Sequence, residues 1–156
     1  MTAFTQYVRD IVEDAGRKAQ AQCSATIEAQ HVLLAIAAHR ETKPGNFLCA
    51  VGLTPESLRG ALDRELERSL NTAGTSLGNF NLQRRHHTSA PVPRLGASVR
   101  QALERGVSSI SKGPKPAHLL LGILLADIGT VPRALELAGY DRAELLARAR
   151  QALAED

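Results

Sequence analysis

Apolar residues recur along most of the chain at three- and four-residue steps, the spacing of one face of an α-helix. In the first half, this spacing predicts four helices, over 4–22, 27–39, 46–51 and 55–66. Thr26 is typical of a residue that caps the start of a helix, and Gly52 of one that ends a helix. Pro55 fits the first position of the fourth helix. The second helix is apolar enough to lie at the centre of a core.

The second half follows the same plan. Apolar spacing predicts three helices, over 95–103, 116–127 and 132–138. Gly139 is expected to end the third of them. Asp141 and Glu144 stand three residues apart, as in a capping box, and open a last helix that runs through Leu153.

The two halves are related by a constant shift. The stretch QHVLLAI at 30–36 returns as AHLLLGI at 117–123, and His31 and His118 are 118 − 31 = 87 positions apart. The same shift, without a gap, relates further pairs: Val12 and Val99, Leu33 and Leu120, Leu48 and Leu135, Gly52 and Gly139, Leu66 and Leu153. Because these positions pack or end helices, the repeat indicates a duplicated fold. We therefore expect an all-α protein, in which two tandem pseudo-symmetric four-helix repeats, eight helices in all, pack as one domain.

The expected domain spans 1–156, with repeat 1 over 4–70 and repeat 2 over 95–153. Residues 71–94 are polar, contain Gly and Ser, end near prolines and lack a helical period, which predicts a linker loop. Loops of this length inside a compact domain are usually functional or disordered.

Composition agrees with a helical, globular chain. Apolar residues make up 44% and charged residues 22%, as in globular proteins. Aromatic residues, which are enriched in strands, make up only 3%. The net charge of +3 permits an anionic partner without demanding one. Cys23 and Cys49 suggest two small buried thiols in a reducing compartment, with a single disulfide as the alternative. No apolar run could span a bilayer, and the start lacks an apolar signal core, so we expect a cytoplasmic protein.

The duplicated plan resembles a known family. Two tandem four-helix units, each with a helix that begins near H-[VL]-L-L-[AG]-I and a glycine before its fourth helix, are similar to the Clp N-terminal (Clp repeat) domain of the ClpA, ClpB and ClpC unfoldases. The resemblance runs from Phe4 to about Leu153. It implies a non-catalytic domain that recognises substrates and adaptors for a AAA+ motor feeding a protease. The chain has no G-x-x-x-x-G-K-[ST] phosphate loop, so we expect a free-standing N-domain acting as adaptor, competitor or ligand sink for the Clp protease system.

The resemblance also implies where ligands bind. In this family a groove between the repeats accepts peptides, and in actinobacterial relatives it is the site of cyclic-peptide antibiotics. Phe4 and Thr5 resemble the usual opening of the first repeat. Pro91 and Val92 stand where the second repeat of the family has Phe-Thr.

In the ClpC branch, a glutamate before each repeated histidine receives the guanidinium of a phosphoarginine. Gln30 and Ala117 take these positions here, so the cation-pairing charge is absent from both, although Glu28 lies close by in the first repeat. The predicted ligand-contacting residues are Phe4, Thr5, Glu28, Gln30, Phe80, Pro91, Arg94 and Ala117.

Three further features allow more than one interpretation. His31 and His118 could form a metal pair, but without neighbouring Cys or carboxylate partners each is expected to tie up the start of its own helix. The stretch QRRHH at 83–87 could hold phosphate, nucleic acid or a metal, and is more simply a solvated loop. Phe80 either packs on the body or docks into a groove as a client peptide would.

No Ser-His-Asp order, paired-carboxylate site or Gly-rich cofactor loop stands out, so we predict neither an enzyme nor a cofactor. The expected partners are Clp ATPase or protease components, their client proteins, and peptide-like ligands such as cyclic-peptide antibiotics. The basic pI of about 9.2 and QRRHH suggest a rival interpretation, a small helical nucleic-acid-binding protein. A third is a structural oligomerisation module.

Overall fold

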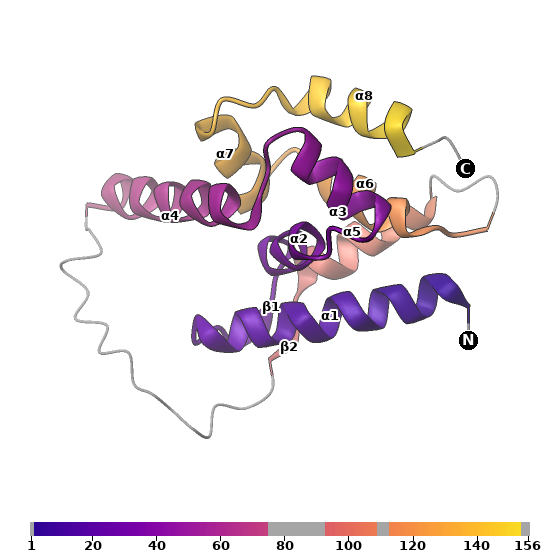
Figure 1. Cartoon of the computed structure of the whole chain (residues 1–156). Helices are drawn as coiled ribbons and strands as arrows, with labels where there is room; N and C mark the ends of the chain where they lie inside the picture. The colour runs from indigo at the N-terminus through magenta and orange to yellow at the C-terminus, as the bar shows by residue number, and fades with distance from the viewer. Residues whose placement is uncertain (1, 75–92, 109–112, 154–156) are drawn as a thin grey trace.

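The part of the chain that the structure describes is almost entirely helical. The computed structural model describes residues 2–74, 93–108 and 113–153 (Figure 1). These residues form eight helices: α1 (Ala3–Ala21), α2 (Ala29–Ala38), α3 (Lys43–Ala50), α4 (Pro55–Thr72), α5 (Ala97–Ser108), α6 (Pro116–Leu124), α7 (Thr130–Leu137) and α8 (Arg142–Leu153). Two short strands, β1 (Thr26–Ile27) and β2 (Arg94–Leu95), precede α2 and α5. The predicted all-α fold of eight helices is confirmed.

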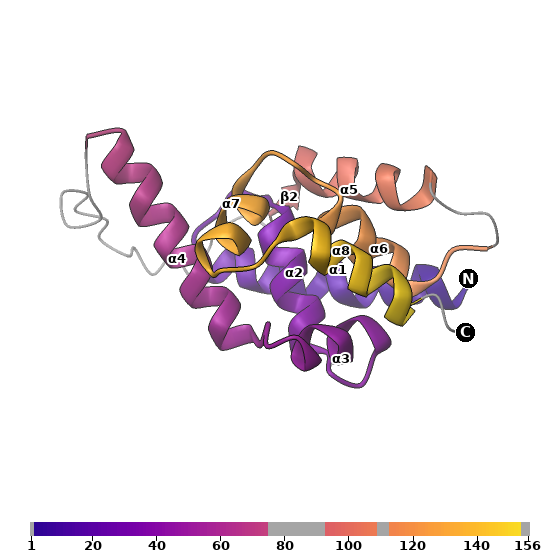
Figure 2. The ribbon, with the colours of Figure 1, turned by 90° about the horizontal axis from the view of Figure 1, so that it is seen from above.

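The helices pack around a shared centre formed by α2 and α6. In each half the first helix packs against the second, α1 on α2 and α5 on α6, while α4 lies against α7 of the other half (Figures 1 and 2). Leu33 and Leu34 of α2 and Leu120 of α6 are at most 1% exposed, as expected for the two most apolar helices. The far end of α4 projects beyond the other helices (Figure 2).

Corresponding helices end in the same way. Gly52 after α3 and Gly139 after α7 have φ angles of 90° and 89°. The Leu53 N–H donates to the Leu48 carbonyl at 2.8 Å, and the Tyr140 N–H donates to the Leu135 carbonyl at 3.0 Å. These bonds close a Schellman motif, which needs a left-handed residue that glycine adopts without strain. Both glycines therefore end helices as predicted.

Two glycines of the second half bring α5 and α6 into close contact. A Cβ atom on Gly122 of α6 would lie 1.9 Å from the Ala102 carbonyl oxygen, and one on Gly106 of α5 would lie 2.3 Å from the His118 carbonyl oxygen. At the matching positions of α1 and α2 stand Ala19 and Ala35. In both halves the smallest side chains let the first two helices approach.

The predicted start of α2 is wrong. Thr26 does not cap this helix; it lies in β1, which pairs in parallel with β2, and Glu28 is the N-cap. Leu95, expected in a helix, lies in β2, and α5 begins two residues later. These strands join segments far apart in sequence, through hydrogen bonds from the Arg94 N–H to the Ala25 carbonyl and from Gly96 to Ile27. Strands of two residues carry no periodic pattern that a sequence could reveal.

Other boundaries moved by a few residues. The third helix begins at Lys43, where Thr42 caps it and Pro44 occupies its first turn. The stretch 71–94, predicted as a loop, begins within α4 and ends in β2, and 75–92 lie outside the described residues together with Phe80, Pro91 and QRRHH. No helix in the described ranges is both long enough and apolar enough to cross a membrane.

Candidate functional site

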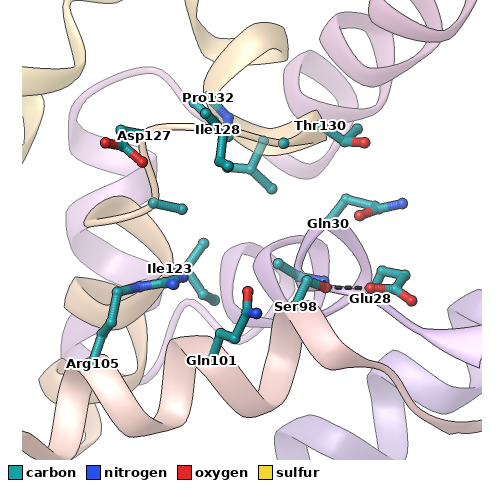
Figure 3. A pocket seen from close by; sticks show the side chains of 14 residues that line it. Glu28, Gln30, Ser98, Gln101, Arg105, Ile123, Asp127, Ile128, Thr130 and Pro132 are labelled. Atoms are coloured by element: carbon teal, nitrogen blue, oxygen red, sulfur yellow. Dashed lines mark hydrogen bonds between the residues drawn. The ribbon is translucent and has the colours of Figure 1, made fainter.

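A hollow of about 490 Å³ lies between the two repeats (Figure 3). Its sides come from the start of α2, from one face of α5 and from the α6–α7 connection, which lie apart in sequence but meet here (Figure 3). We call this hollow the inter-repeat groove. Its lining residues are Glu28, Ala29, Gln30, Ser98, Gln101, Arg105, Ile123, Ala126, Asp127, Ile128, Gly129, Thr130, Val131 and Pro132.

The side formed by α5 is polar. Ser98, Gln101 and Arg105 follow one another at three- and four-residue steps, so the helix presents all three on the same face. Figure 3 shows them in a row along α5, with Arg105 and Ser98 at opposite ends. The Arg105 Nε–H donates to the Gly122 carbonyl at 3.1 Å, which holds the guanidinium against α6.

The opposite side is formed by the α6–α7 connection and is largely apolar. Ile128 is 84% exposed, unusual for so large an aliphatic side chain, and extends from this connection into the space facing α5 (Figure 3). Gly129, with a φ angle of 120°, makes the turn that starts α7. Val131 and Ile123 add apolar surface beneath it. The inter-repeat groove therefore combines apolar and hydrogen-bonding walls, as ligand pockets commonly do.

Glu28 closes one end of the groove and links the repeats. The Thr26 hydroxyl donates to Glu28 Oε1 at 2.8 Å, and the Ser98 hydroxyl donates to Oε2 (Figure 3). The same Ser98 oxygen accepts from the Ala29 N–H at 2.8 Å. A Cβ on Gly96 would lie 2.3 Å from Glu28 Oε1, so the backbone before α5 also packs on this carboxylate. Both oxygens of Glu28 are thus engaged within the protein.

The repeated histidines have equivalent roles, as predicted. His31 Nδ1 accepts from the Glu28 N–H at 3.0 Å, and His118 Nδ1 accepts from the Lys115 N–H at 2.8 Å. Each ring satisfies a backbone donor next to the start of its helix. Burial lowers the pKa of His31 below its ordinary value, and the nearby Glu28 carboxylate opposes this only in part.

The positions of repeat 1 that are equivalent to the α5 side of the groove carry different side chains. Counting back by 87 residues, Gln101 corresponds to Asp14, Arg105 to Lys18 and Ala126 to His39. In repeat 1, Asp14 forms an ion pair with Lys18, its Oδ2 lying 3.5 Å from Lys18 Nζ, and the same oxygen lies 3.4 Å from His39 Nε2. In repeat 2, the neutral Gln101 takes the place of Asp14 and the small Ala126 takes the place of His39, and both line the groove.

A second hollow of about 480 Å³ lies between α4 and α7. An ion pair lies at its edge, with Arg133 Nε 2.8 Å from Oε1 of the buried Glu65. The Ser69 hydroxyl donates to the same oxygen at 2.6 Å. Since these groups satisfy one another, this hollow is the weaker candidate for a ligand.

Potential metal ligands and the two cysteines are the remaining candidates for chemistry in the described ranges. Among the described residues, no group of three or more His, Cys, Asp or Glu side chains is placed to hold a metal ion. Cys23 and Cys49 are both free thiols. The prediction that both are buried is wrong for Cys23, which is exposed where the chain turns after α1, with a φ angle of 57°, and Cys49 is only half-buried.

Two of the predicted contact residues, Glu28 and Gln30, line the inter-repeat groove. Four others, all described, do not line it. Phe4 and Thr5 lie in the first turn of α1, Arg94 is exposed in β2, and Ala117 is 8% exposed in the core. Phe80 and Pro91 lie outside the described residues. A role in binding stays a prediction for all eight.

The prediction missed Ser98, Gln101, Arg105 and Ile128. The 87-residue shift could have revealed two of them, because Gln101 and Arg105 replace the complementary pair Asp14 and Lys18. Ile128 could have been noticed as a lone aliphatic residue in the polar stretch ADIGT. No sequence signal distinguishes Ser98, because its place in the groove depends on its contact with Glu28.

Two packed helical repeats, with a groove between them, define a class of small helical recognition domains. A comparison with protein families matches residues 3–88 to the Clp repeat (R) N-terminal domain, which is more than half of the chain, and the protein belongs to that family. No curated protein matches the chain. The family match covers repeat 1, whereas the equivalence of repeat 2 is seen in its helix starts and helix ends. Domains of this family are non-catalytic and bind substrates and adaptors of Clp ATPases.

Proposed function

We propose that the protein binds extended segments of client or adaptor proteins of a Clp system in the inter-repeat groove. The observation that carries the proposal is the exposed Ile128 facing the polar side of α5 across a hollow of about 490 Å³. An aliphatic side chain left in solvent, beside side chains that can hydrogen-bond, is stabilised when a ligand covers it. A peptide can supply both the apolar side chains and the backbone hydrogen-bonding groups that such a groove requires.

Binding by this route needs no chemical step. Apolar side chains of the segment would pack on Ile128 and Val131, while Gln30 and Gln101 would hydrogen-bond to its backbone. Cyclic-peptide antibiotics present the same combination of groups and are the small-molecule ligands that we propose. In the cell, the protein would act as adaptor, competitor or sink for ligands of the Clp protease.

Substitution of Ile128 tests the groove directly. We expect Ile128→Arg to abolish the binding of a permanently unfolded probe, such as reduced carboxymethylated α-lactalbumin, measured by titration calorimetry. Val107→Arg is a matched control, because Val107 is also an exposed aliphatic residue, at 53%, but does not line the groove. Equal binding by both variants and the original protein would place the ligand elsewhere.

A pull-down from the protein's own cytosol tests the assignment to a Clp system. Clp ATPase subunits or their clients are expected to come with the original protein and not with the Ile128→Arg variant. Nucleic-acid binding remains the alternative that the pI suggests; it predicts binding to a random duplex that weakens steeply with added salt and does not depend on Ile128.

A further inference from the structure

Arg105 lies at one end of the inter-repeat groove and forms no ion pair with a carboxylate of the described residues. Its Nε–H is held by the Gly122 carbonyl at 3.1 Å, which fixes the guanidinium in place. Within the described residues, no carboxylate oxygen lies within 4.0 Å of it. The remaining guanidinium N–H groups are donors suited to an incoming anion.

The internal repeat indicates that this lack of a partner is specific to one half. The counterpart of Arg105 is Lys18, since 105 − 87 = 18, and Lys18 pairs with Asp14 at 3.5 Å. The counterpart of Asp14 is Gln101, which has the same place on the helix but no charge. The second repeat therefore keeps the cation and lacks the carboxylate that neutralises it in the first.

Two carboxylates also line the groove, Glu28 at the end away from Arg105 and Asp127 on the same side as Arg105 (Figure 3). Glu28 lies at the opposite end and has both oxygens engaged by Thr26 and Ser98 (Figure 3). Asp127 is exposed at the rim and forms no ion pair with any described residue. Beside Arg105 lies Ile123, with Ile128 across the groove, so that a ligand bound here meets a cation and aliphatic surface together (Figure 3).

We propose that the groove selects peptide segments in which an acidic side chain stands next to an aliphatic one. The carboxylate pairs with the Arg105 guanidinium, and the aliphatic side chain packs on the exposed Ile128. This selection rests on the proposed function, because it concerns which peptides the same groove prefers. Charge-assisted pairs of this kind at a half-exposed site are expected to change the dissociation constant about three- to tenfold.

The preference is measured with peptides that differ at one position. Three peptides, Ser-Gly-Leu-Xaa-Ile-Gly-Ser with Glu, Gln or Lys at Xaa, are titrated into the ¹⁵N-labelled protein and followed by the amide shifts of Ser98, Gln101 and Ile128. The Glu peptide is expected to bind about three- to tenfold more tightly than the Gln peptide, and the Lys peptide least tightly. Added salt should reduce the difference, because it screens a partly exposed pair.

Two variants, Arg105→Gln and Gln101→Asp, test whether Arg105 causes the preference for the Glu peptide, and two further variants serve as controls. Arg105→Gln should remove the difference between the Glu and Gln peptides. Gln101→Asp rebuilds the acid–base pair of repeat 1 and should lower the affinity for the Glu peptide at least threefold. Lys18→Gln, the matching change in the other repeat, should leave the preference intact. Gln30→Glu adds the same negative charge as Gln101→Asp but at the other end of the groove, and should lower the affinity for the Glu peptide less.

The outcomes separate the two proposals. Equal binding of the Glu and Gln peptides, tighter binding of the Lys peptide, or a preference that survives Arg105→Gln overturns the selectivity while peptide binding in the groove stands. Failure of all three peptides to shift any amide signal, together with failure of the unfolded probe, overturns the proposed function as well.

Discussion

The hydroxyl of Tyr140 donates a hydrogen bond to the carbonyl oxygen of Val51 at 2.8 Å. Tyr140 follows α7 and Val51 follows α3, so this bond joins the end of the third helix in one repeat to the corresponding end in the other. The counterpart of Tyr140 in repeat 1 is Leu53, which is buried and has no hydroxyl. The duplicated scaffold is therefore connected at this point by a bond that only one repeat can supply.

Removing this hydroxyl should weaken the protein measurably. We expect Tyr140→Phe to lower the free energy of unfolding by about 1 kcal/mol, because the partly buried bond is lost while the ring remains. Urea denaturation followed by circular dichroism measures the change.

Tyr7 offers a matched control. Its buried hydroxyl has no hydrogen-bond partner among the described residues, since the nearby Thr42 hydroxyl donates to the His39 carbonyl instead, and burial raises the pKa of the phenol. Tyr7→Phe should therefore leave the stability unchanged or raise it. A loss as large as that of Tyr140→Phe would contradict this assignment of the two hydroxyls.

His31 should make the stability depend on pH. Burial lowers its pKa in the folded protein below the ordinary 6.5, and protonation of Nδ1 would break its bond to the Glu28 N–H. The unfolded chain then binds the proton more readily, so this contribution to stability is complete above about pH 6.5 and is lost as the pH falls towards the lowered pKa. The slope is at most about 1.4 kcal/mol per pH unit.

The pH effect is tested with His31→Gln, which keeps a hydrogen-bond acceptor but does not titrate. The free energy of unfolding between pH 7.5 and 5.5 should fall more steeply for the original protein than for the variant. Parallel curves would show that His31 is not the group responsible.

The glycine contact between α5 and α6 predicts an unusually damaging alanine. We expect Gly122→Ala to lower the free energy of unfolding by about 2–3 kcal/mol, because its Cβ would lie 1.9 Å from the Ala102 carbonyl oxygen and force the helices apart. Gly60 in α4 is the control, since the nearest atom to its added Cβ is the flexible end of Arg64 at 3.8 Å. Gly60→Ala should raise stability by up to about 1 kcal/mol through helix propensity, as thermal unfolding would reveal.

Cys23 is the one residue other than glycine with a positive φ angle in the described part of the chain. It ends α1 as Gly52 ends α3, with the Ser24 N–H donating to the Ala19 carbonyl at 2.9 Å. We expect Cys23→Gly to raise the free energy of unfolding by about 0.5–1 kcal/mol, because glycine adopts this conformation without strain. Gly52→Ala should lower it by at least as much, because its Cβ would also lie 3.0 Å from the Tyr140 hydroxyl oxygen. Chemical denaturation in which Cys23→Gly destabilises or Gly52→Ala stabilises the protein would contradict this.

The helical spacing and the two glycine stops were sufficient to predict the eight helices, because side-chain periodicity and backbone freedom act within a few residues of each position. The predicted role of the two histidines was confirmed for the same reason, since each ring bonds to a backbone N–H three residues before it. The start of α2 could not be predicted, because Thr26 lies in a strand that pairs with Arg94, a residue far away in the sequence.

The sequence by itself determined the eight helices, the glycine ends of two of them and the equivalence of the two halves, since all three follow from short-range spacing and from a constant shift. Only the tertiary structure decided which side chains meet across the halves. The contact of Ser98 with Glu28, the lack of an ion pair between Arg105 and any described carboxylate, and the exposure of Ile128 depend on how the two helical units pack. They could not be predicted because equivalent positions in the two repeats have different neighbours in space.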